Sequence, residues 1–192
     1  MATRTRDHWI STSRPISGSY AELTFGGISL YSSTPEALDK YIDQVRTATS
    51  DVLLDHLLLI RQVLKAKVQE NCSFSLTDRI FGAVLGRMLK MGELKVLLCL
   101  TANFKRMRVI YHSKNHDRLN EIIAAVRAKV LIAGSVSTSE VQASYFEGLW
   151  AGYYMAQQVC GALSYRGYLV HTDRDQFVLP REVIDAVGLR IS

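Results

Sequence analysis

Two strand-like segments stand next to each other near the middle of the chain, an apolar one over 93–101 and a basic one over 105–112. Only residues 102–104 separate them, which is short enough for a hairpin loop, so the two segments predict an antiparallel pair. Helix-like segments flank the pair. Because the predicted strands mostly come in neighbouring pairs and do not alternate singly with helices, the sequence predicts an α+β fold.

Length and composition favour one folded body. The chain has 192 residues, of which 48% are apolar and only three are proline. This is enough apolar material for one well-packed core, and the scarcity of proline argues against long linkers. We expect a flexible basic arm over 1–19 and a single compact domain over 20–192, built of mixed helices and short antiparallel strands.

The cysteines and the apolar stretches indicate the cellular compartment of the protein and its relation to membranes. Cys72, Cys99 and Cys160 are widely spaced and odd in number, and the last two stand in apolar runs, which favours reduced, buried thiols and a reducing compartment. Residues 143–163 form the most apolar stretch but contain Glu and Gln, so they are too polar for a membrane span. No apolar run of signal-peptide length stands near the N-terminus. We therefore expect any membrane contact to be peripheral.

The first third of the chain predicts one strand and two helices. Residues 20–31 alternate as a strand that bends at a glycine pair. Residues 32–36 combine hydroxyl caps, a proline and an acid, which is typical of a helix start. Thr49-Ser50-Asp51 offers a second cap, and apolar side chains at helical spacing continue beyond it to Val68. We expect a helix boundary at this second cap.

The remaining two thirds predict further capped helices and a second hairpin. Thr77 caps a helix that stops at Gly92, and Ser137 with Glu140 matches a capping box. An aromatic helix is expected after that box, through Tyr153. Strands over 168–171 and 176–179 form the second hairpin, and a last short helix begins at Pro180.

Positive charge is concentrated in residues 61–130, which hold fourteen Lys and Arg and five Asp and Glu, a local charge of +9 in a chain of net charge +5. A positive block of this kind is typical of proteins that bind a polyanion, either a nucleic acid or an anionic membrane. The alternative is an ordinary solvated face with scattered cations. The candidate contact residues for nucleic acid or anionic lipid are Lys90, Lys95, Lys105, Arg106, Arg108, Lys114 and Arg118.

The densest part of the block is the predicted basic strand and the turn after it. On a half-buried strand, Arg106 and Arg108 share one face. Phe104 and Tyr111 flank these cations and would supply stacking or shallow membrane contact. The sequence therefore favours a charged patch on a folded surface over a charged disordered tail.

The histidines do not predict a metal or an acid–base site. His112 and His116 stand four apart, but a helix cap separates them and no third ligand is near, so two surface histidines are the simpler interpretation. His171 precedes two aspartates in a pattern that a charged hairpin turn explains. We expect no metal, no cofactor and no enzymatic activity, with a small enzyme whose site is unrecognised as one alternative.

In element order and size, the chain resembles the matrix proteins of rhabdovirus-like negative-strand RNA viruses. The resemblance covers about residues 1–110 and rests on three features in order: a basic arm with Arg4, Arg6 and Arg14, a strand over 20–31, and the capped helix start at 32–36. Pro15 stands alone, so the Pro-rich late-budding motif of the animal members is absent. A plant-virus member is compatible with that departure.

The resemblance implies a structural protein that bridges a ribonucleoprotein to the inner face of a membrane envelope and condenses it by self-association. It implies RNA or a ribonucleoprotein, an anionic membrane surface and further copies of the chain as partners, and the virion and host cytoplasm as locations. An RNA-binding regulator without a membrane role, such as a viral silencing suppressor, is the alternative from the same residues.

Overall fold

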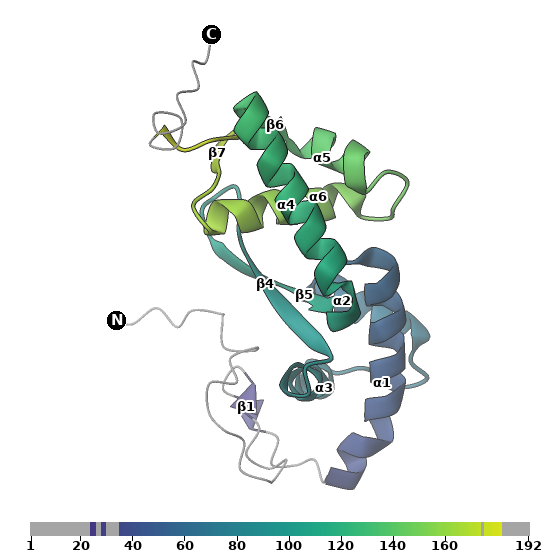
Figure 1. Cartoon of the computed structure of the whole chain (residues 1–192). Coiled ribbons are helices and arrows are strands. Elements are labelled where there is room, and N and C mark those ends of the chain that lie inside the picture. Colours follow the sequence, from purple (N-terminus) through teal and green to yellow (C-terminus); the bar gives the residue numbers. More distant parts are fainter. Residues whose placement is uncertain (1–23, 26–27, 30–34, 174, 182–192) are drawn as a thin grey trace, which may run out of the picture. The chain divides into compact units, whose positions relative to one another are not determined.

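The computed structural model describes residues 24–25, 28–29, 35–173 and 175–181 (Figure 1). The expected basic arm over 1–19 and the expected last helix beyond Arg181 lie outside the described residues. Helices alternate with small antiparallel sheets, which confirms the α+β prediction. The chain divides into two compact units: unit 1 comprises residues 1–55 and 61–95, and unit 2 comprises residues 56–60 and 96–192.

Unit 1 is mainly helical. Its helices are α1 (Pro35–His56, whose last residue belongs to unit 2), α2 (Arg61–Asn71) and α3 (Asp78–Lys90). Two short strands, β1 (Thr24–Phe25) and β2 (Ile28–Ser29), pair antiparallel across the glycine pair. The prediction of one bent strand over 20–31 is therefore wrong, because the described residues form two strands that pair with each other, with Phe25 opposite Ile28.

Helix α1 continues without a boundary through the expected cap at Thr49-Ser50-Asp51. Thr49 is fully buried, and the apolar stripe that contains Val45 and Val52 runs past it on the same helix. Burial of this stripe outweighs the local preference of Thr, Ser and Asp for a cap. The predicted boundary at 49–51 is wrong for that reason.

The chain instead breaks after His56, where Leu57 has a positive φ of 60°. Strand β3 (Leu59–Ile60) follows, and it pairs antiparallel with a later strand, with Leu59 opposite Ile110. A short buried apolar run suits a helix or a strand equally, and here strand pairing decides. The expected continuous helix to Val68 is therefore two helices separated by a two-residue strand.

Helix α3 begins and ends as predicted. The Thr77 hydroxyl accepts a hydrogen bond from the backbone N–H of Ile80 at 3.2 Å, which caps the first turn. Gly92, at φ 76°, donates its N–H to the carbonyl of Leu89 and closes the last turn.

Unit 2 contains two three-stranded sheets. The first has the order β3-β5-β4, formed with β4 (Leu94–Leu100, which starts in unit 1) and β5 (Arg106–His112). The second has the order β6-β8-β7, formed by β6 (Ser135–Ser137), β8 (Gln176–Val178) and β7 (Val170–Asp173). Both predicted hairpins, β4–β5 and β7–β8, are present.

The helices of unit 2 pack with these sheets around one apolar core. A 3₁₀ turn, η3 (Ser113–Asn115), leads into α4 (His116–Ala133), and α5 (Thr138–Tyr145) and α6 (Gly152–Tyr165) follow. Helices α4 and α5 both contact α6 (Figure 1). The core cluster includes the buried side chains of Val109, Val126, Leu163 and Phe177.

The predicted capping box is present, but the aromatic helix after it is interrupted. Ser137 and Glu140 bond each other's backbone N–H groups and begin α5. Helix α5 then ends at Tyr145, because Phe146 turns into the core and is fully buried. At Gly152 a β-carbon would collide with the Phe146 carbonyl oxygen, so only glycine allows α6 to start this close to the turn.

A second glycine positions the β4–β5 hairpin. A β-carbon on Gly161 of α6 would lie 2.6 Å from the carbonyl oxygen of Leu100, at the end of β4. The absence of a side chain lets α6 contact the strand backbone directly, next to the hairpin loop.

Candidate functional site

The tip of the β4–β5 hairpin, residues 101–105, is a closed and ordered loop. Thr101 N–H donates to the Lys105 carbonyl at 2.9 Å, and Phe104 N–H donates to the Thr101 carbonyl at 2.8 Å. The Thr101 hydroxyl also accepts from Lys105 N–H at 3.2 Å. Phe104 adopts a positive φ of 55°, which is uncommon for a bulky residue, and its side chain is 65% exposed. The loop therefore presents an aromatic ring to solvent in a strained backbone conformation.

Cations stand close to Phe104 in the chain and near a second aromatic ring. Lys105 and Arg106 follow Phe104 directly in the chain and are exposed. The Arg106 guanidinium lies 6.0 Å from the centroid of the Tyr165 ring, at the end of α6. Exposed Arg166 follows Tyr165. We call Phe104, Lys105, Arg106, Tyr165 and Arg166 the tip cluster.

Tyr165 and Arg166 are the members of the tip cluster that the sequence did not predict. Arg166 directly follows Tyr165, whose ring lies 6.0 Å from the Arg106 guanidinium at the start of β5. Arg166 stands sixty positions after Arg106, in a segment of negative net charge. Only the packing of α6 against β4 brings it to the hairpin, so no local sequence signal marks it.

The other predicted contact residues of unit 2 do not join the tip cluster. Exposed Lys114 and Arg118 follow the opposite end of β5, in η3 and the first turn of α4. The seven residues of β5 span about 20 Å at the usual rise per residue, so the predicted patch over 105–118 is two groups of cations. Arg108, between them, is half-buried and already makes an interaction within the protein.

Lys90 and Lys95 belong to unit 1. Lys90 stands at the C-terminus of α3, is exposed and makes an interaction of its own, and Lys95 on β4 is half-buried. Both residues therefore belong to a different unit from the tip cluster.

Ion pairing differs between the cations of the chain. Arg46, Arg61, Lys65 and Lys67 of unit 1 pair with Asp43, Glu93, Asp78 and Glu70 at 3.0–3.4 Å. Lys129 of unit 2 pairs with Glu140 at 3.6 Å. Within the described part of the chain, no cation of the tip cluster forms an ion pair, so the full positive charge of this cluster faces solvent.

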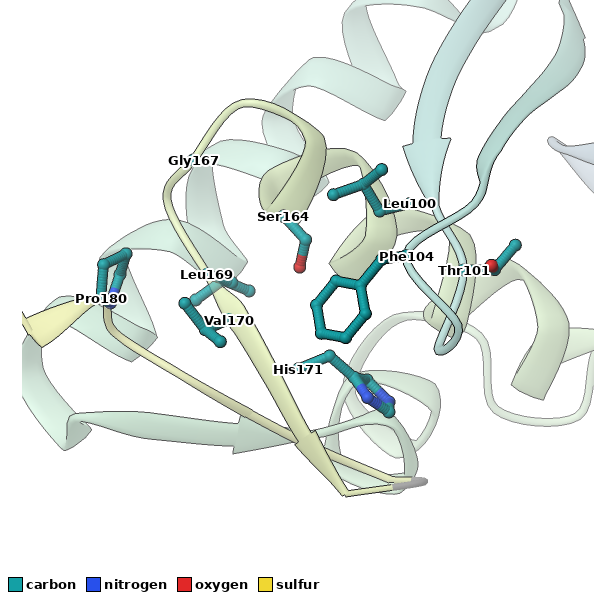
Figure 2. A pocket seen from close by; sticks show the side chains of 9 residues that line it. All are labelled: Leu100, Thr101, Phe104, Ser164, Gly167, Leu169, Val170, His171 and Pro180. Atoms are coloured by element: carbon teal, nitrogen blue, oxygen red, sulfur yellow. The ribbon is translucent and has the colours of Figure 1, made fainter.

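A cavity of about 340 Å³ opens beside the tip cluster (Figure 2). Leu100, Leu169 and Val170 supply apolar walls, and Phe104 forms part of its rim. Ser164 and His171 also line it. The Ser164 hydroxyl and His171 Nε2 are buried and have no hydrogen-bond partner among the described residues. Figure 2 shows Phe104 and the Ser164 side chain among the lining residues, with the Thr101 side chain directed away from the Phe104 ring.

His171 is oriented by packing and not by a polar partner. Its ring meets the Phe177 ring edge-on, with centroids 4.7 Å apart. The carboxylate of Asp175, in the same hairpin turn, accepts hydrogen bonds from Ser139 at 2.9 Å and from Tyr153 at 3.2 Å. This carboxylate anchors the turn to α5 and α6.

The other two candidate histidines have structural partners. His112 is buried, contrary to the prediction of a surface side chain, and its Nδ1 accepts from Lys114 N–H at 3.1 Å, which caps η3. His116 lies 3.0 Å from the Tyr111 hydroxyl through Nδ1 and 3.1 Å from the Asn120 amide nitrogen through Nε2. Among the described residues, no group of three or more His, Cys, Asp or Glu is placed to hold a metal ion.

The cysteines are free, and two are deeply buried. Burial raises the pKa of Cys99 and of Cys160 to about 12, so both thiols are protonated at neutral pH. Cys99 donates to the Gln158 carbonyl at 3.2 Å and contributes to the contact between β4 and α6. Their role is packing, as the apolar sequence around them predicted.

Comparison of the chain with protein-family models and with curated proteins finds no match. None of the described helices has the length and apolar character required to cross a membrane.

Proposed function

We propose that the protein is a non-enzymatic, matrix-like assembly protein that binds RNA or a ribonucleoprotein, contacts an anionic membrane peripherally and self-associates. The observation that carries this proposal is the tip cluster, in which Lys105, Arg106 and Arg166 have no ion-pair partner among the described residues and flank two exposed aromatic rings. Unpaired cations attract phosphates, and adjacent aromatic faces provide sites for stacking.

The membrane part of the proposal rests on apolar side chains near these cations. Phe104 and Val170 are 65% and 41% exposed at the rim of the cavity. Cations beside exposed apolar groups suit an anionic bilayer surface, where the charges meet headgroups and the rings enter the interface.

A second candidate function is an RNA-binding regulator without a membrane role. The specific observation in its favour is the polar pair in the cavity, Ser164 and His171, because hydrocarbon chains offer nothing for these groups to bond.

Two binding measurements on the wild-type chain test the proposal. Filter binding of a single-stranded RNA across a salt series should give a clearly negative slope of log affinity against log salt. Sedimentation with vesicles that contain an anionic phospholipid should show binding at low salt, and neutral vesicles serve as the control. The triple variant Lys105→Glu, Arg106→Glu, Arg166→Glu should weaken both, while circular dichroism shows an unchanged fold.

The outcomes separate the candidates. A salt slope near zero would remove phosphate contact as the basis of RNA binding. RNA binding without any vesicle binding would select the regulator. Binding to both ligands that survives the triple variant would place the contact surface elsewhere.

A further inference from the structure

The cavity beside the tip cluster has the features of a ligand site. Its volume of about 340 Å³ lies at the small end of the range for small-molecule pockets, about 300–1,000 Å³. Two polar groups in its lining, the Ser164 hydroxyl and His171 Nε2, are buried without partners among the described residues, and Ser164 as a whole is only 9% exposed. Buried polar groups in proteins are nearly always hydrogen-bonded, so two unpaired groups on residues that line one cavity indicate a ligand that completes them.

We propose that this cavity receives one unstacked nucleobase of a single-stranded nucleic acid, with the neighbouring phosphates on the cations of the tip cluster. This inference rests on the proposed RNA-binding function and names the part of the ligand that enters the protein.

The polar groups select a base over an acyl chain. The edge of a nucleobase carries both donors and acceptors, and a serine hydroxyl and a neutral imidazole nitrogen can each pair with one of them. A hydrocarbon chain would fill the apolar walls but would leave Ser164 and His171 unpaired in a dry site, which is costly.

The rim suits the rest of a nucleotide. The exposed Phe104 ring offers a face on which a base can stack as it enters, and exposed aromatic platforms of this kind are common in single-strand binding. Lys105 and Arg106 follow Phe104 in the chain and are exposed, so positive charge is available near the ring for the phosphates of a bound strand. A base in a duplex is paired and stacked, which restricts this site to single strands.

The strained loop is consistent with a recognition role. Phe104 holds a positive φ because Thr101 bonds both Phe104 and Lys105. Strain of this kind in a bulky residue persists where the surrounding bonds enforce it and is enriched at ligand sites. The loop thus holds the ring at the cavity before any ligand arrives.

The test compares strands that have the same phosphates but differ in their bases. Fluorescence anisotropy of the purified full chain would be measured with labelled 12-nucleotide RNA, with DNA of the same sequence, and with an abasic 12-mer. We expect the abasic strand to bind roughly 5- to 150-fold more weakly than RNA, the range that one stacked base supplies. Because DNA also carries bases, DNA of the same sequence should bind nearly as much more tightly than the abasic strand as RNA does.

Variants of two residues that line the cavity test whether the cavity causes the tighter binding of RNA relative to the abasic strand. Phe104→Ala should remove most of the difference between RNA and the abasic strand, whereas Phe104→Tyr should retain the difference. Ser164→Ala should reduce the same difference. Because Phe104 is largely exposed, its truncation leaves the core intact.

Other results overturn the inference in distinguishable ways. Equal binding of RNA and abasic strands by the wild type refutes the base site while the phosphate-binding function stands. Binding of neither strand at low salt refutes both. If Phe104→Ala weakens binding to phosphatidylserine vesicles but leaves base discrimination unchanged, the occupant is an acyl chain and not a base.

Discussion

Unit 1 and unit 2 each contain seven of the cations in the basic block over 61–130, but their side chains are used differently. In unit 1, six of the seven have an ion pair or another interaction within the protein, and Lys95 is the exception among the described residues. In unit 2, the side chains of Lys105, Lys114 and Arg118 have none in the described part of the chain, and Arg106 only meets a ring.

This difference teaches that the net charge of a segment does not locate a binding surface. A cation that already has a carboxylate beside it must give up that partner before it binds a phosphate, whereas an unpaired one loses only water and counterions. The positive surface of this chain is therefore better sought at the hairpin tip of unit 2 than across the whole block.

The largest expected effect is on RNA affinity, and it is tested by reversing the charge of two cations in one unit and comparing the result with the same change in the other unit. Lys105→Glu with Arg106→Glu should lower the affinity for single-stranded RNA on the order of 100-fold at low salt and reduce the salt slope by about 2, because two phosphate contacts are lost. Lys65→Glu with Lys67→Glu changes the net charge equally but should alter affinity by less than about threefold.

Filter binding at several salt concentrations measures both double variants, and Lys114→Glu with Arg118→Glu adds the far end of β5. Equal losses for all three would mean that only the total charge of the protein matters. That result would show that the cations of unit 1 and unit 2 contribute equally to RNA binding.

A smaller effect, on stability, tests whether packing inside unit 2 presents the hairpin. Gly161→Ala would place a β-carbon 2.6 Å from the Leu100 carbonyl oxygen, so α6 must move away from β4. We expect destabilisation of about 1–3 kcal/mol, together with weaker RNA binding. Urea denaturation measures the first effect. Gln157→Ala on the same helix is the control and should stay within about 0.5 kcal/mol of the wild type. Unchanged stability of the glycine variant would show that the helix and the strand are not in tight contact.

A third effect has the opposite sign. Ser164→Ala removes a buried hydroxyl that has no partner among the described residues, so the free protein should gain about 1 kcal/mol of stability. Ser137→Ala, which removes the capping box of α5, should lose about 1 kcal/mol instead. Thermal unfolding of both variants checks the contrast. A loss of stability in the Ser164 variant would mean that its hydroxyl is already satisfied.

The smallest expected effect comes from neutralising a carboxylate that pairs with two cations of unit 1. Asp78→Asn frees Arg61 and Lys65 from their shared carboxylate, which is 68% exposed, so stability should fall by less than about 1 kcal/mol. RNA affinity should rise slightly, by about twofold, because one negative charge is removed beside Arg61 and Lys65. An unchanged or lower affinity would show that cations of unit 1 lie outside the reach of the RNA even when unpaired.

The same carboxylate has a defined pH signature. The hydrogen bond from Lys65, and the charges of Lys65 and Arg61, hold the pKa of Asp78 below its ordinary value. Its contribution to stability is therefore present above the ordinary pKa of the carboxyl group and is lost as the pH falls through the lowered one. Urea unfolding between pH 5 and pH 2 should show this part of the acid dependence in the wild type and not in the Asp78→Asn variant.

Local chemistry predicted those features that depend on near neighbours in the chain. Thr77 caps α3, Ser137 and Glu140 form a capping box, and both short-loop hairpins are present, because the partners in each case stand within a few residues of one another. The buried state of Cys99 and Cys160 also follows from the apolar residues around them.

Predictions failed where burial competes with local preference. Thr49 lies inside a helix although its neighbours favour a cap, and residues 59–60 pair as a strand although their spacing suits a helix. The turn at 146–151 interrupts an aromatic segment because Phe146 enters the core. In each case the deciding contact is with a residue distant in the sequence.

The candidate site divides in the same way. The sequence by itself determined an α+β chain with a basic hairpin and an aromatic residue at its tip, because charge and strand alternation are written in consecutive residues. Only the tertiary structure decided that Arg166, Ser164 and His171 stand beside that hairpin and that half of the basic block belongs to another unit. Residues about sixty positions apart come together because α6 packs against β4. No local pattern in either segment predicts that contact.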